Sequence, residues 1–121
     1  MNPVQNGVII LNIEVLRTIF PMSINSHLLP DNETVLIAVD GRFDDTQEKA
    51  FVEAMREYPQ GEKGYLLDLA NASMVASAGI GLILMLSQYS SVRHKVKISN
   101  ATGIVLSSIM MAHLDKFFEF Q

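Results

Sequence analysis

The sequence contains no cysteine and no tryptophan, and charged residues make up only 18% of its 121 residues. Without cysteine the chain can form no disulfide, no thiolate metal site and no cysteine nucleophile, a composition typical of proteins in a reducing compartment. Its nine lysines and arginines are scattered along the chain and are outnumbered by thirteen acidic residues, which gives a formal net charge of -4. Because no basic stripe is evident that could neutralise phosphates, we expect no nucleic-acid binding.

The sequence also lacks an apolar run long enough to cross a bilayer. The N-terminal stretch 8–20 is interrupted by Asn12, Glu14 and Arg17, and it is shorter than the ~20 residues that a membrane span requires. No positively charged start and no small-residue cleavage site precede Pro21, so no secretory signal is predicted. We therefore expect a cytoplasmic protein without membrane insertion.

The residues that are present predict one α/β domain. Hydrophobic residues make up 49% of the sequence, and a chain of this length can build a single core. The segment T-V-L-I-A-V-D is β-branched and apolar, as expected of a buried strand, whereas the acidic residues Asp44 and Asp45 can cap a helix. Strands that alternate with helices favour a mixed, mainly parallel sheet of four to five strands with helices packed on it. Strands are predicted at 23–29, 34–40, 65–69, 95–99 and 117–120, and helices after Asp45, over 80–92 and after Thr102.

The two later helices carry apolar residues around most of their circumference. We therefore expect the helix over 80–92 to be covered on nearly all sides. Four methionines in apolar context are expected to fill the core, although methionine also suits adaptable binding surfaces. These are Met74, Met85, Met110 and Met111.

Ser77 lies among small residues in V-A-S-A-G, directly before an apolar run. This segment lacks the leading glycine of the G-x-S-x-G nucleophile elbow, and His27, His94 and His113 carry no recognisable motif, so a serine hydrolase is not predicted. Two interpretations stay open for Ser77: a helix N-cap, or an exposed hydroxyl that is modified.

No cofactor or metal is predicted either. Gly79 and Gly81 open a helix without the third glycine of a dinucleotide motif or the lysine of a phosphate loop, so close helix packing is the better interpretation. Asp44, Asp45 and His27 do not have metal-ligand spacing.

The stretch L-L-D-L-A-N-A-S-M-V-A-S-A-G-I-G-L, residues 66–82, resembles the signature of STAS domains, in particular the bacterial anti-sigma factor antagonists. In that family a strand ending in Asp-Leu leads into Asp-Ser-x-Gly-x-Gly at a helix start. Residues 41–44, G-R-F-D, resemble the family's Gly-x-x-Asp segment. The resemblance implies a STAS domain over residues 22–121. The matching positions are Asp68, Ser77, Gly79, Gly81 and, in the second segment, Gly41 and Asp44.

What the resemblance implies is a switch without catalysis. In such antagonists the serine at the position of Ser77 is phosphorylated by a partner kinase that is itself the anti-sigma factor, and a PP2C-type phosphatase restores it. The unphosphorylated antagonist binds the kinase, and the sigma factor is released. The implied partner-binding residues are Asp44, Ala76, Ser77, Ala78, Gly79, Leu82 and Met85.

Ala76 and Ala78 stand where the family has an aspartate and a second serine. Their presence keeps open an alternative function, a non-phosphorylated STAS subunit that acts as a constitutive scaffold in a lipid-transport or stress-signalling assembly. Asp44 is open between helix cap and partner contact. Residues 1–21 have no counterpart in the pattern, and we expect an N-terminal extension there that could mediate a homodimer.

Overall fold

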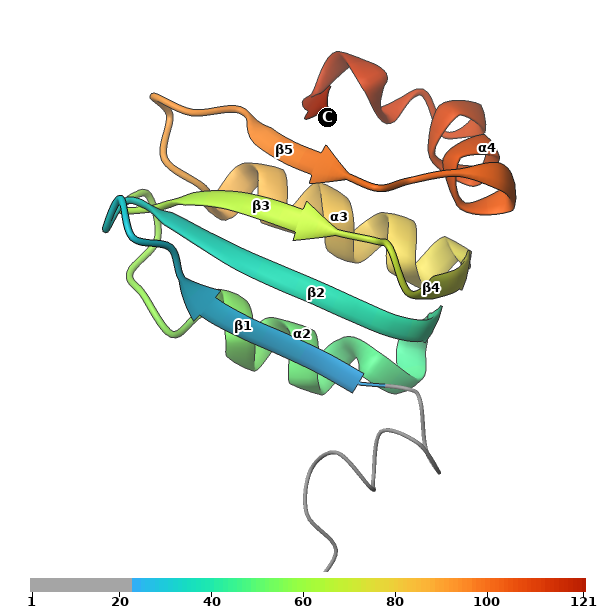
Figure 1. Ribbon diagram of the computed structural model, residues 1–121, viewed down its shortest axis with the longest axis horizontal. Coiled ribbons are helices and arrows are strands. Elements are labelled where there is room, and N and C mark those ends of the chain that lie inside the picture. The colour runs from blue at the N-terminus through green and yellow to red at the C-terminus, as the bar shows by residue number, and fades with distance from the viewer. Residues whose placement is uncertain (1–22) are drawn as a thin grey trace, which may run out of the picture.

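The computed structural model describes residues 23–121, so the predictions for residues 1–21 lie outside the described part. Strands and helices alternate along it (Figure 1). The 3-10 turns η2 and η3 join some of them. The α/β prediction is therefore confirmed. The elements are β1 (Ser23–Leu28), β2 (Thr34–Phe43), η2 (Asp45–Gln47), α2 (Glu48–Met55), β3 (Gly64–Asp68), β4 (Ala72–Val75), α3 (Ser77–Tyr89), β5 (Val96–Ser99), α4 (Gly103–Met111), η3 (Leu114–Lys116) and β6 (Phe118–Phe120).

The sheet is mixed and mainly parallel, in the order β1-β2-β3-β5-β6. Among the described strands, β1 alone is antiparallel to its neighbour, because a tight turn joins it to β2. In that turn the Asp31 carboxylate accepts backbone hydrogen bonds from Glu33 (2.9 Å) and Thr34 (2.9 Å), and Asn32 has a positive φ of 63°. One further strand, β4, also pairs with β2 but is not part of this order. The sheet therefore has six strands, whereas four to five were predicted.

The end of β2 is what brings β4 into the sheet. The register shifts between Gly41 and Arg42, and the last residues of β2 then pair with β4, Phe43 opposite Val75. Gly41 has φ 84°, a backbone conformation that glycine adopts without a Cβ penalty. Its N–H donates to the carbonyl of Asn71 (2.9 Å). The end of β2 therefore lies beside the segment that leads into α3.

The core lies between the sheet and the helices α2 and α3, which cover the same face of the sheet (Figure 1). Alternate residues of β2, Val35, Ile37 and Val39, are fully buried there, as the period of two along a strand requires. The buried Tyr65 hydroxyl of β3 donates to the carbonyl of Met55 (2.9 Å) and so fixes the end of α2 to the sheet.

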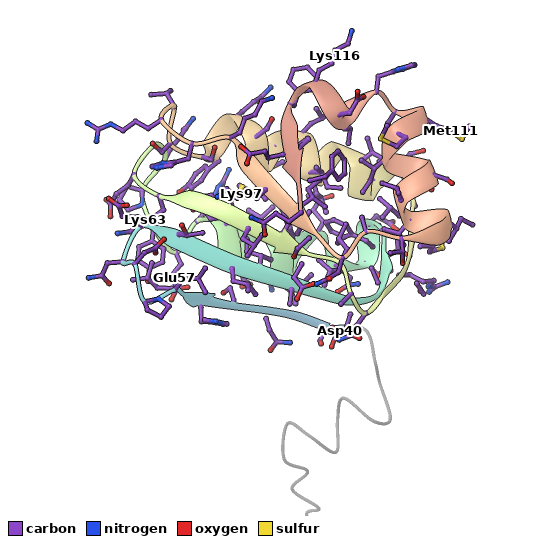
Figure 2. The ribbon with its side chains drawn as sticks, turned by 45° about the horizontal axis from the view of Figure 1, so that its top comes forward. Asp40, Glu57, Lys63, Lys97, Met111 and Lys116 are labelled. Carbon is purple, nitrogen blue, oxygen red and sulfur yellow. The ribbon has the colours of Figure 1, made fainter. Side chains whose placement is uncertain are left out.

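Two predictions about the later helices are wrong. Helix α4 buries Val105 and Ile109, but Met110 is 45% exposed and Met111 is 80% exposed, so neither fills the core. Figure 2 shows Met111 pointing away from the domain. Helix α3 is not covered on nearly all sides, because its residues Ser77, Gly81 and Met85 form an exposed stripe at i, i+4 spacing.

Candidate functional site

Ser77 is the first residue of α3 and is exposed. The N-cap position belongs to Ala76, and no side chain caps the helix, so the N-cap interpretation of Ser77 is wrong. Within residues 23–121 the Ser77 hydroxyl has no hydrogen-bond partner. A hydroxyl that is exposed and unpaired is accessible to a modifying enzyme, and its modification breaks no hydrogen bond within residues 23–121.

The start of α3 is held against the end of β2. The Ala76 N–H donates to the carbonyl of Phe43 (3.0 Å). A Cβ on Gly79 would lie 2.3 Å from the same carbonyl oxygen and 3.0 Å from Cγ1 of Val75, so only glycine allows this approach. The packing interpretation of Gly79 is confirmed. A Cβ on Gly81 would meet nothing within 4 Å, so packing does not explain that second glycine.

Asp44 follows directly on Phe43 and therefore lies at the same end of the sheet as Ser77. Its carboxylate accepts a hydrogen bond from the backbone N–H of Thr46 (3.0 Å) and another from the Thr46 hydroxyl. The Arg42 guanidinium is 3.8 Å away. The Thr46 hydroxyl and, to a lesser degree, the Thr46 N–H and Arg42 hold the pKa of Asp44 below its usual value. Asp44 thus caps η2, as one of its two interpretations predicted, and a contact with a partner stays a prediction.

A groove lies between α3 and α4 beside Ser77, with a volume of about 390 Å³. We call it the α3–α4 groove. Its polar side chains are the hydroxyls of Ser77 and Ser108, and the Ser108 hydroxyl is turned back onto the carbonyl of Ile104 (2.9 Å). None of the described residues that line it is charged. The lining residues are Val75, Ser77, Ile80, Ser108, Met111 and Ala112.

The predicted partner-binding residues separate into surface and core. Ala76 and Ala78 are half-buried next to Ser77, and Met85 is 37% exposed two turns further along α3. Gly79 is buried and Leu82 is only 3% exposed, so neither residue offers surface to a partner in this conformation. Their assignment to the surface needs correction, because the 3.6-residue period turns both toward the sheet.

Sequence reasoning missed the part of the groove that α4 contributes. Met111 was expected in the core, and Ser108 was not singled out. The sequence of α4 has six apolar residues in nine but does not show which of them are buried, and in the structure only Val105 and Ile109 are.

Asp68, which matches the strand aspartate of the motif, has a structural contact of its own. Its carboxylate accepts from the Ala70 N–H (3.0 Å) and from Nδ2 of Asn100 (2.9 Å). Asn100 is in the left-handed conformation with φ 62°. These bonds join the ends of β3 and β5, from which the chain continues to β4 and α4, and both of these elements contribute residues near the α3–α4 groove.

Solved structures share the overall fold of this chain. An anti-sigma factor antagonist from Mycobacterium paratuberculosis matches with a TM-score of 0.64 at 16% sequence identity, covering 81% of this chain and 85% of that one. The anti-sigma factor antagonist SpoIIAA in its unphosphorylated form matches with a TM-score of 0.58, also at 16% identity, covering 82% of this chain and 88% of that one. This chain has the STAS fold of those antagonists.

The similarity to these antagonists lies in the fold and not in the sequence. No family model matches the sequence, and no curated protein matches it. Within residues 23–121, no helix is long and apolar enough to cross a membrane.

Proposed function

We propose that this protein is a partner-switching regulator of the anti-sigma factor antagonist type, without catalytic activity of its own. Its unphosphorylated form binds an anti-sigma factor that is also a serine kinase, and this binding frees a sigma factor. The kinase phosphorylates Ser77, and a PP2C-type phosphatase reverses the modification. The observation that supports this most directly is the exposed, unpaired Ser77 hydroxyl at the rim of an apolar groove, in the fold of two anti-sigma factor antagonists.

The groove supports a contact that a phosphate would oppose. Met111 and Ile80 offer apolar surface beside Ser77, and burying apolar surface is the main favourable term in most protein association. A phosphate on Ser77 adds a charge of about −1.5 to −2 at this rim. Because no cationic side chain lines the groove, the phosphate would lose hydration in the complex without gaining a counter-charge from this chain.

The test compares substitutions of Ser77 by affinity capture from the protein's own cells. Tagged wild type and Ser77→Ala should capture the same kinase, whereas Ser77→Asp should lose it. Ser107→Asp is the matched control, since it adds the same charge to an exposed serine of α4 that does not line the groove. Equal capture by Ser77→Ala and Ser77→Asp would refute the switch. Mass spectrometry of the same wild-type sample should find phosphate on Ser77 that changes between growth and stress.

A second candidate function is a constitutive scaffold subunit that is never phosphorylated. It is favoured by Ala76 and Ala78, because neither alanine can supply the acidic or hydroxyl group that the antagonist motif has at these positions. The two functions differ in the captured partner. A scaffold would bring down a transporter or another assembly subunit instead of a kinase, and its Ser77 would carry no phosphate under either condition.

A further inference from the structure

A second groove lies at the opposite end of α3 from Ser77 and has a volume of about 620 Å³. The last turns of α3 form one side, and the segment that leads into β5 and the end of η3 form the other. We call it the α3–η3 groove. Its lining includes Ser87, Val92, His94, Lys95, Lys116 and Phe117.

The charged side chains of this groove are basic, whereas the whole chain has a net negative charge. Three basic side chains line it, and none of the described lining residues is Asp or Glu. By contrast, a depression along α2 is lined by Asp45, Glu48 and Glu53 with a single lysine. The sequence suggested no basic cluster, but the fold brings Lys95 and Lys116 together from segments far apart in the chain.

Lys95 and Lys116 are exposed and form no ion pair with any residue in 23–121. Figure 2 shows Lys116 extending into solvent at the edge of the domain. Because both lysines are exposed and unpaired within this range, their charges are available to a ligand. Arg93, exposed and adjacent to the groove, adds a third cation that has no ion pair within the same range.

Apolar side chains stand beside these cations. Val92 is fully exposed, with a relative accessibility of 102%, and Phe117 is 51% exposed. Each is next in sequence to a basic residue, Arg93 and Lys116 respectively. Apolar tips flanked by lysine and arginine are the arrangement by which peripheral proteins contact a bilayer interface, where the apolar groups enter the acyl boundary and the cations meet anionic headgroups.

We propose that the α3–η3 groove binds the phosphate groups of an anionic lipid surface. Lys95 and Lys116 contact headgroup phosphates, and Val92 and Phe117 enter the interface on either side. Binding is peripheral, because no described helix can span a membrane. A lipid surface is favoured over an acidic protein because Val92 and Phe117 are exposed. A bilayer interface can accept both side chains, whereas a protein partner would need a surface of complementary shape. The proposal stands independently of the function of Ser77.

The test is sedimentation of the full chain with vesicles of phosphatidylcholine alone and of phosphatidylcholine mixed with phosphatidylglycerol. We expect binding only to the vesicles that contain phosphatidylglycerol, weakening as salt is raised. Lys95→Gln and Lys116→Gln should each weaken it roughly fivefold, and Val92→Ser with Phe117→Ser should weaken it several-fold further. Lys49→Gln, which removes a charge from the depression along α2, is the matched control and should bind as the wild type does.

Residues 1–22 are kept in every variant, so any contribution that they make is common to all. If the groove substitutions left vesicle binding unchanged, the proposal would be overturned. It would also be overturned if the wild type bound neither kind of vesicle. A free phosphate compound is tested by adding glycerol 3-phosphate and following backbone amide resonances. Resonance shifts around Lys95 and Lys116 without vesicle binding would overturn the lipid surface in favour of a small phosphorylated ligand. Loss of a captured acidic protein by the lysine variants, again without vesicle binding, would overturn it in favour of that protein.

Discussion

The two glycines at the start of α3 offer a direct test of how the site is built. Gly79→Ala should destabilise the domain, whereas Gly81→Ala should stabilise it. Both residues lie in the first half of the same helix, two positions apart. They differ in what an added Cβ would meet: the carbonyl oxygen of Phe43 at 2.3 Å for Gly79, and nothing within 4 Å for Gly81.

The magnitude follows from that difference. Replacing a helical glycine by alanine gains roughly 0.5–1 kcal/mol of stability through lower backbone entropy in the unfolded chain. This gain applies to both variants and cancels when they are compared. What remains is the steric term at Gly79, where helix and strand must move apart, and overpacking of this kind costs roughly 1–3 kcal/mol. Gly81→Ala should therefore be more stable than Gly79→Ala by about that amount.

Urea unfolding followed by circular dichroism measures both effects. The midpoint should fall for Gly79→Ala and rise for Gly81→Ala with the slope unchanged, because a shift at constant slope reports stability alone. Equal midpoints for the two variants would refute the close approach between α3 and the Phe43 carbonyl. A lower midpoint for Gly81→Ala than for wild type would show that this position is not open.

Two further predictions concern charge at this end of the domain. Ser77→Asp places a carboxylate in the first turn of α3 and should stabilise the domain by about 0.3–1 kcal/mol through the helix dipole. Urea unfolding should show this gain, and added salt should reduce it. A destabilised Ser77→Asp would contradict the described helix start. Because the pKa of Asp44 is lowered from 3.8 in the folded state, its carboxylate contributes stability that is fully present above pH 3.8 and is lost as the pH falls through the folded pKa. The stability difference between wild type and Asp44→Asn should shrink on acidification in that window, and a difference independent of pH would exclude the Thr46 contact.

The sequence predicted those parts of the fold in which a local pattern decides the outcome. β2 has the continuous apolar, β-branched composition of a buried strand, and the turn before it has the Asp and Asn residues that favour such turns. By contrast, β4 has only four residues and forms because the last residues of β2 turn toward it after Gly41. That pairing is a tertiary effect, and no local signal in A-S-M-V indicates it.

The candidate site was predictable only along α3. The apolar run after Ser77 predicted a helix over 80–92, whereas α3 spans Ser77–Tyr89, so the run located the helix but not its first turn. It could not separate Leu82 from Met85, because both are apolar and only the packing against the sheet shows which one is buried. The same ambiguity hid Met111. In a helix as uniformly apolar as α4, the sequence contains no polar face from which the exposed side could be read.

The two grooves lie at opposite ends of α3. Their separation determines whether a charge at one groove can affect binding at the other. Helix α3 has thirteen residues, so its first and last Cα atoms are about 18 Å apart. Exposed charges at physiological ionic strength are screened over about 8 Å. A phosphate on Ser77 therefore exerts little electrostatic effect on Lys95 and Lys116, and a lipid surface at the far groove leaves the α3–α4 groove open. A partner and an anionic surface could then occupy the domain together, so that a phosphate on Ser77, if it forms, would not release the domain from the lipid surface.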